Sequence, residues 1–181
     1  ALQKFIFKPT NKVTHRLNIQ FSTTSDVPRY DRLQEKSGDF PKFAEWYYGP
    51  QNRIMTSYSF SIAAERKMYD YVNFVVGYQR IKESRHSRRF NSDTRRSQVE
   101  DVDVAGMNLD FSKGAGKHLI RYGIETNFNY VWSTASEQDI YSGIVTPTET
   151  RYPSGGTSVY AGAAYLSHSW SITPLIKMQE G

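Results

Sequence analysis

The sequence contains no cysteine, and none of its 181 residues belongs to an apolar run long enough to form a transmembrane helix. The absence of cysteine excludes a disulfide scaffold and a thiolate metal site. Apolar residues at helical spacing are almost absent, which argues against a helical domain. The N-terminal residues have no charged segment followed by an apolar one and a small-residue cleavage site, so we expect no signal peptide in this chain.

Aromatic residues are abundant, because 13 Tyr, 10 Phe and 3 Trp make up 14% of the chain. Such residues favour β-strands and membrane interfaces. The formal net charge is +5, which would suit an anionic surface, an anionic ligand or a nucleic acid. Composition alone therefore leaves the partner open but favours a β-protein.

Strict alternation of apolar and polar residues recurs along the chain and predicts β-strands. The longest example has one face made of His118, Ile120, Tyr122, Ile124, Thr126, Phe128, Tyr130 and Trp132. Further strands are predicted at 13–23, 54–62, 72–79, 98–112 and 157–170, with others ending at residue 8 and beginning at residue 175. Most of them reach the roughly 9–11 residues that a tilted membrane strand needs.

The connections between these strands alternate in length. Short ones are expected at 9–12, 63–69, 113–116 and 171–174, and long ones at 24–50, 83–98 and 134–156. This order is typical of an up-and-down barrel with short periplasmic turns and long extracellular loops. The sequence therefore predicts an all-β fold: an antiparallel up-and-down transmembrane β-barrel, represented by about seven strands of a larger barrel, because so few cannot enclose so many large polar side chains.

Several segments resemble the barrels of TonB-dependent outer-membrane receptors, particularly those of Bacteroidetes-like bacteria. They read SDVPRYDRL (25–33), FAEWYYGPQNR (43–53), YQRIKESRHSRRF (78–90), VEDVDVAGMNLD (99–110), KHLIRYGIE (117–125) and RYPSGGTS (151–158). The resemblance extends over nearly the whole chain but over only a minor part of a complete family member.

The resemblance implies a barrel of about 22 strands, closed by an N-terminal plug domain. Residues 1–181 are then expected to be part of a single barrel domain, without the plug and the signal peptide. The family lies in the bacterial outer membrane and imports scarce nutrients such as iron-siderophores, haem, cobalamin or glycans. TonB would be a partner through the plug, and outer-membrane lipid and lipopolysaccharide would surround the barrel.

Two groups of residues are candidates for ligand binding. Residues of the first long loop could line a vestibule, because aromatic rings beside arginine suit planar or sugar-like ligands: Arg29, Tyr30, Asp31, Arg32, Trp46, Tyr47 and Tyr48. A basic run on the second long loop includes Arg85 and His86, which could attract an anionic ligand or, in the case of His86, bind haem iron.

Each candidate has a structural alternative. Asp31 could simply pair with an arginine, Trp46 to Tyr48 could form an interfacial aromatic girdle, and the basic run could contact lipopolysaccharide. No catalytic constellation, metal-ligand spacing or cofactor motif is recognisable, and the basic run lacks the aromatic platform of a nucleic-acid site. We expect a non-enzymatic transporter; a passive porin or structural barrel is the alternative, and an outer-membrane enzyme a third.

Overall fold

The chain folds into one large antiparallel sheet in the computed structural model, which describes residues 1–181. Eight strands follow one another across it: β1 (Leu2–Thr10), β2 (Val13–Thr23), β7 (Asn52–Ala63), β8 (Tyr71–Arg89), β9 (Thr94–Ala115), β10 (His118–Asp139), β12 (Thr157–Thr173) and β13 (Ile176–Glu180). Smaller elements complete the chain: β3 (Val27–Pro28), α1 (Tyr30–Leu33), β4 (Lys36–Ser37), β5 (Phe40–Pro41), β6 (Phe43–Tyr48) and β11 (Val145–Pro147). The predicted all-β, antiparallel fold is confirmed.

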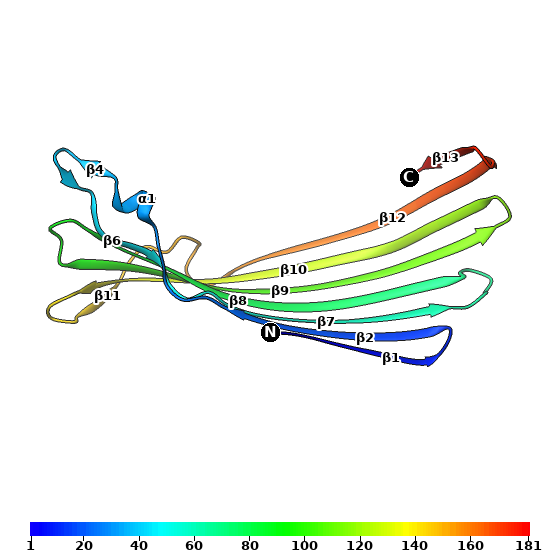
Figure 1. Cartoon of the computed structure of the whole chain (residues 1–181), viewed down its shortest axis with the longest axis horizontal. Coiled ribbons are helices and arrows are strands. Elements are labelled where there is room, and N and C mark those ends of the chain that lie inside the picture. Colours follow the sequence, from blue (N-terminus) through cyan, green and yellow to red (C-terminus); the bar gives the residue numbers. More distant parts are fainter.

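The two ends of the sheet differ. The β1–β2, β7–β8, β9–β10 and β12–β13 connections gather at one end, which we call the short-turn end (Figure 1). The opposite end, the long-loop end, carries β4, α1, β6 and β11. The sheet is open, because β1 pairs only with β2 and β13 only with β12. No helix in the chain is long and apolar enough to cross a membrane.

Strands extend into two of the predicted loops. β8 continues to Arg89 and β9 begins at Thr94, so a four-residue turn replaces most of the loop predicted at 83–98. β10 likewise extends to Asp139, into the loop predicted at 134–156. The loop predicted at 83–98 was wrong for most of its length and the loop predicted at 134–156 was wrong at its start, because these strand extensions carry polar side chains on both faces and lack alternation. Hydrogen bonds between backbone groups are enough to hold a hairpin together. The pairing of β8 with β9 therefore continues as far as Arg88 opposite Arg95.

Each face of the sheet has its own chemistry, since directly paired residues point to the same side. One row across seven strands consists of Phe7, His15, Phe60, Phe74, Leu109, Ile124 and Ala164. The next row, on the opposite side, consists of Thr14, Ser61, Asn73, Asp110, Gly123 and Tyr165. We call these the apolar face and the polar face.

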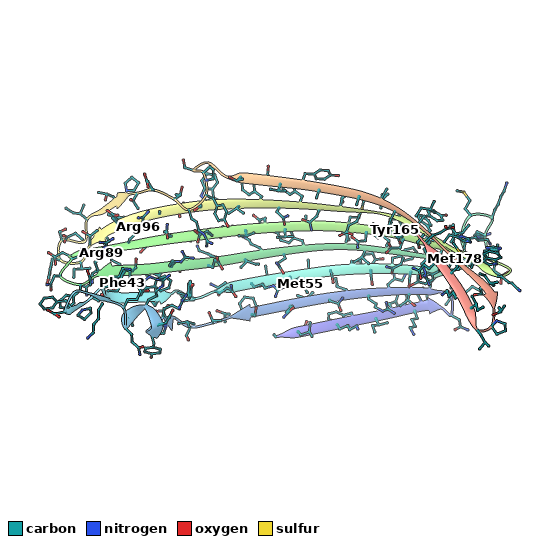
Figure 2. All side chains as sticks on the ribbon, turned by 90° about the horizontal axis from the view of Figure 1, so that it is seen from above. Phe43, Met55, Arg89, Arg96, Tyr165 and Met178 are labelled. Carbon is teal, nitrogen blue, oxygen red and sulfur yellow. The ribbon has the colours of Figure 1, made fainter.

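The sheet is one layer thick and has no hydrophobic core. Side chains project freely from both sides of the ribbon (Figure 2). Only 6 of 181 residues are buried, and no hydrophobic residue is among them. Large apolar side chains on the apolar face are therefore exposed, including Leu17 at 37%, Ile19 at 37% and Ile124 at 43%.

A glycine on the polar face makes room for a tyrosine of the neighbouring strand. A Cβ atom added to Gly123 would lie 2.6 Å from the Leu109 carbonyl oxygen and 2.7 Å from Cε1 of Tyr165. The Tyr165 ring thus lies against the bare backbone of Gly123, and its hydroxyl donates to Asp110 Oδ1 at 2.9 Å. This contact joins β9, β10 and β12.

Replacing Gly123 by Ala should destabilise the sheet by about 1–3 kcal/mol, because the new methyl group clashes with backbone and displaces the Tyr165 ring. Denaturant unfolding measures the change in the free energy of unfolding. Gly77→Ala is the matched control, since its added Cβ would meet nothing closer than 3.8 Å on the same face. Equal stability of the two variants would contradict the packing role of Gly123.

Candidate functional site

An arginine–aromatic cluster, formed by Arg29, Trp46, Tyr48 and Arg85, occupies the polar face at the long-loop end. The rings of Trp46 and Tyr48 meet edge to face with their centroids 5.1 Å apart. Both guanidinium groups lie over these rings: Arg29 is 5.2 Å from the Trp46 centroid and Arg85 is 5.7 Å from that of Tyr48. Such cation–π contacts fix the arginines while leaving their N–H groups available.

Strand pairing brings the three segments of this cluster together. β3 pairs with β6, placing Val27 opposite Tyr48, and the Arg29 amide donates to the Trp46 carbonyl at 3.0 Å. β6 pairs in turn with the extension of β8, placing Tyr48 opposite Arg85. The β8 extension that the sequence did not reveal is therefore what holds Arg85 beside the first long loop.

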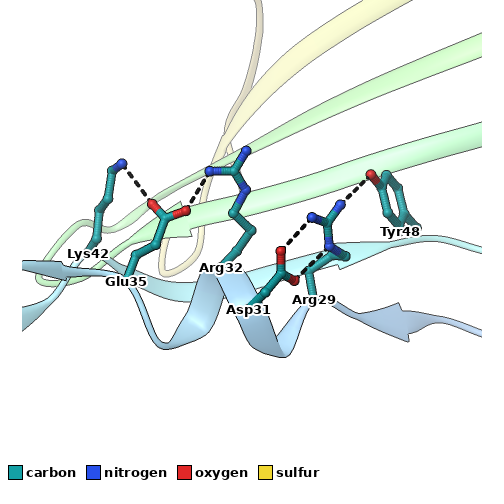
Figure 3. Close-up of polar contacts among 6 residues, drawn as sticks. All are labelled: Arg29, Asp31, Arg32, Glu35, Lys42 and Tyr48. Carbon is teal, nitrogen blue, oxygen red and sulfur yellow. Dashed lines mark hydrogen bonds and ion pairs between the residues drawn. The ribbon is translucent and has the colours of Figure 1, made fainter.

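Arg29 is fully engaged within the cluster. Its Nε and Nη2 donate to the two carboxylate oxygens of Asp31 at 2.7 and 2.6 Å, and its Nη1 donates to the Tyr48 hydroxyl at 2.7 Å (Figure 3). The hydrogen bond from Arg29 lowers the pKa of Asp31 to about 2, and the same carboxylate raises the pKa of Arg29. The expected pairing of Asp31 with an arginine is confirmed, so Arg29 and Asp31 act as a rigid support.

Arg85 is the less satisfied arginine. It takes part in no ion pair with a carboxylate, and its Nε is buried without a hydrogen-bond partner. A cavity of about 350 Å³ opens beside it. Its lining consists of Thr24, Val27, Tyr48, Gly49, Gln51, Glu83, Ser84 and Arg85. A guanidinium without a carboxylate partner, next to hydroxyl, amide and aromatic groups and the Glu83 carboxylate, suits a hydroxyl-rich ligand that also carries an anionic group.

Tyr30 and Arg32 do not join the cluster. The Tyr30 side chain is 69% exposed on α1. Arg32 Nη1 instead lies 2.5 Å from Glu35 Oε1, and Lys42 Nζ lies 2.8 Å from the other oxygen of that carboxylate (Figure 3). The hydrogen bonds from Lys42 and Arg32 lower the pKa of Glu35. These contacts hold α1 against the strands that follow it.

Tyr47 and His86 lie on the opposite face from the cluster, because their strand positions alternate with those of Tyr48 and Arg85. Their rings stack with centroids 4.8 Å apart. Both ring nitrogens of His86 contact hydroxyls, at 2.8 Å to Ser97 and 3.0 Å to Ser84, and burial lowers its pKa. His86 is thus a neutral, engaged ring in this structure, which leaves no free nitrogen for haem iron.

Trp46 and Tyr48 point to the polar face, which argues against their alternative role in an aromatic girdle on the apolar face. Two arginines of the basic run share one carboxylate, since Glu45 accepts from Arg88 and Arg95 at 2.9 Å each. No group of three or more His, Cys, Asp or Glu side chains is arranged to hold a metal ion.

The sequence did not single out Glu100, which lies beside the cluster. It is 3% exposed, directly opposite Glu83 on β8 and Ser133 on β10, and its Oε1 has no hydrogen-bond partner. Burial raises the pKa of its carboxyl. In the sequence, Glu100 is marked only by its position in the alternation of residues, which places it on the polar face with Asn108 and Asp110.

Comparison with protein-family models finds none that matches this chain, and comparison with curated proteins finds no match either. The geometry of the molecule itself therefore carries the functional argument.

Replacing Glu100 by Gln should leave the chain at least as stable at pH 7. The free energy of unfolding of this variant should also depend less on pH between about pH 4.5 and neutrality than that of the wild type. A carboxyl with a raised folded-state pKa favours folding below its unfolded-state pKa, and that contribution is lost as pH rises through the folded-state value. Thermal unfolding across this range measures it. Glu125→Gln, an exposed acid on the same face, is the control, and a Glu100→Gln profile as steep as wild type would contradict the burial argument.

Proposed function

We propose that this chain is part of an outer-membrane β-barrel that binds a scarce nutrient and imports it with energy from TonB. The observation that carries the proposal is a single-layer sheet with one apolar and one polar face and no core between them. Such a sheet needs two different environments, and a lipid bilayer around a water-filled interior provides both.

The apolar face supports a location in hydrocarbon. Large exposed apolar patches on a protein in water mark interaction surfaces, and this one extends across every long strand. Aromatic residues occupy both rims, as expected at headgroup level. At the long-loop end these are Phe21, Tyr78, Phe128, Trp132 and Tyr160, and at the short-turn end Phe111, Tyr122 and Trp170.

The part of the sheet that spans the membrane would end, on the long-loop side, at the row of paired residues that contains Lys82, Asp101 and Trp132. β2 and β7 end at or next to this level, with Thr23 paired to Asn52, whereas β8, β9 and β10 continue beyond it. The continuing segments are polar and carry the arginine–aromatic cluster. We therefore assign the long-loop end to the cell exterior, where a ligand would first meet the protein.

The edges of the sheet support closure by further strands. The outward backbone groups of β1 and β13 have no partner strand. In hydrocarbon each unsatisfied group costs several kcal/mol, so an open edge is not viable there. We propose that these edges pair with other strands of a larger barrel, and that residues 1–181 belong to one barrel domain.

Import, as opposed to passive diffusion, is supported by the cluster and by the resemblance of the sequence to TonB-dependent receptors. A pore needs no specific docking surface, whereas Arg85, Trp46 and Tyr48 form a rigid one beside a cavity. The protein would bind and release its ligand without covalent chemistry. Siderophores, haem, cobalamin and glycans are the ligand classes to test, with TonB acting through a plug domain.

Labelling of single introduced cysteines tests the membrane location directly, because residues 1–181 contribute no native thiol. Ile124→Cys and Glu125→Cys place a thiol on opposite faces of adjacent positions of β10. In the full-length protein in liposomes, a label at 124 should be quenched by spin-labelled lipid, and one at 125 by a water-soluble quencher. Equal quenching of both labels by the water-soluble agent would refute the membrane barrel.

The import function is tested by growth. A deletion strain complemented with the gene should depend on it for growth on one of haem, a ferric siderophore, cobalamin or an oligosaccharide as sole source. Arg85→Gln and Trp46→Ala should each weaken uptake of that source by tenfold or more, since single anchor residues carry a few kcal/mol. Arg89→Gln removes a charge at the same end without touching the cluster and should have no effect. Growth without dependence on any source would leave a passive porin as the better description.

A further inference from the structure

Two histidines of neighbouring strands face each other at the short-turn end of the apolar face. His118 lies on β10 opposite Trp170, and His168 lies on β12 opposite Ile120. Nδ1 of His118 is 2.9 Å from Nε2 of His168, and the two ring planes are 16° from parallel. No metal-ligand spacing is visible in the sequence here, because the two histidines are 50 residues apart.

A carboxylate of the next strand determines which nitrogen of His168 carries a hydrogen. Glu180 on β13 is paired with His168, and its Oε1 lies 3.0 Å from His168 Nδ1. An ionised carboxylate can only accept a hydrogen bond, so Nδ1 carries the hydrogen. Nε2 of the neutral ring then presents its lone pair toward His118. Histidines that bind metal ions usually donate their other N–H to a carboxylate in this way.

The ring of Trp170 holds His118 in place. It stacks on the imidazole with the centroids 5.6 Å apart and the ring planes 17° from parallel. The pair is nevertheless open to solvent, since the His168 side chain is 33% exposed. An ion with its bound water can therefore reach the two nitrogens.

The other two histidines of the chain contact hydroxyl groups. His15 Nδ1 lies 2.8 Å from the Tyr58 hydroxyl, and both nitrogens of His86 contact serine hydroxyls. Only His118 and His168 direct imidazole nitrogens at each other.

We propose that His118 and His168 bind one divalent transition-metal ion, such as Zn²⁺ or Cu²⁺, between these two nitrogens. Imidazole is a common ligand of both ions. Two metal–nitrogen bonds of about 2.0–2.1 Å at a tetrahedral angle place the nitrogens about 3.3 Å apart, so a shift of about 0.4 Å opens the pair enough. The ion replaces the hydrogen between the nitrogens, that hydrogen moves to Nε2 of His118, and water fills the remaining coordination positions.

The bound ion links β10 to β12 directly and reaches β13 through Glu180. β13 has five residues and pairs only with β12. The ion therefore stabilises the part of the sheet with the shortest of its eight main strands. This inference depends neither on the proposed import nor on the imported ligand.

The test is a titration of the full-length protein, without a histidine tag, with ZnCl₂, followed by isothermal titration calorimetry. His118→Gln and His168→Gln should each weaken Zn²⁺ binding by tenfold or more. Glu180→Gln should weaken it by about tenfold, since loss of such a carboxylate commonly lowers metal affinity by 10–100-fold. His15→Gln, which removes a histidine of the same face that contacts Tyr58, should leave binding unchanged.

Copper gives a measurement that a merely structural histidine pair would not affect. The electron paramagnetic resonance spectrum of the Cu²⁺-loaded protein should show coupling to two imidazole nitrogens, and either histidine variant should lose this two-nitrogen pattern. Four results would overturn the inference: no saturable Zn²⁺ binding by the wild type, unchanged binding by both histidine variants, unchanged binding by Glu180→Gln, or coupling of Cu²⁺ to a single nitrogen in the wild type.

Discussion

The antiparallel hydrogen-bond ladder holds this molecule in one shape, because no hydrophobic core does so. Of 119 backbone hydrogen bonds, 99 lie within strands or helices, while no hydrophobic side chain is buried. The side chains then determine only which environment each face of the sheet can contact. The β8–β9–β10 ladder is the longest and continues past the proposed membrane boundary, so it links the spanning part directly to the arginine–aromatic cluster.

Alternation of residues predicted the long strands of the sheet well, since it reflects the different chemistry of the two faces. The strand predicted at 13–23 matches β2, and the face shared by His118 to Trp132 is reproduced in β10. The same signal failed beyond residues 82 and 133, where both faces are polar and alternation carries no information. The strands continue there because the backbone ladder does not depend on side-chain polarity.

The sequence indicated which residue types form the candidate site, but not which of these residues contact one another. Arginine and aromatic residues in the first long loop indicated a binding surface. The contacts among them depend on strand register. The register places Trp46 and Tyr48 on the same face as Arg85, and it places Tyr47 and His86 on the opposite face. Glu100 had no signal in the sequence beyond its place on the polar face, because its burial follows from the pairing of three strands.

β6 and β7 share one edge of β8, and the Gly49–Pro50–Gln51 segment separates them. Proline has no amide hydrogen to donate, so the ladder is interrupted at this point. A residue gained or lost between Val27 and Tyr48 would shift only the β6 pairs, and the β7 pairs from Asn52–Lys82 to Ala63–Tyr71 would keep their register. The long-loop end of the sheet can therefore change in length over evolution while the pairing of the long strands stays the same.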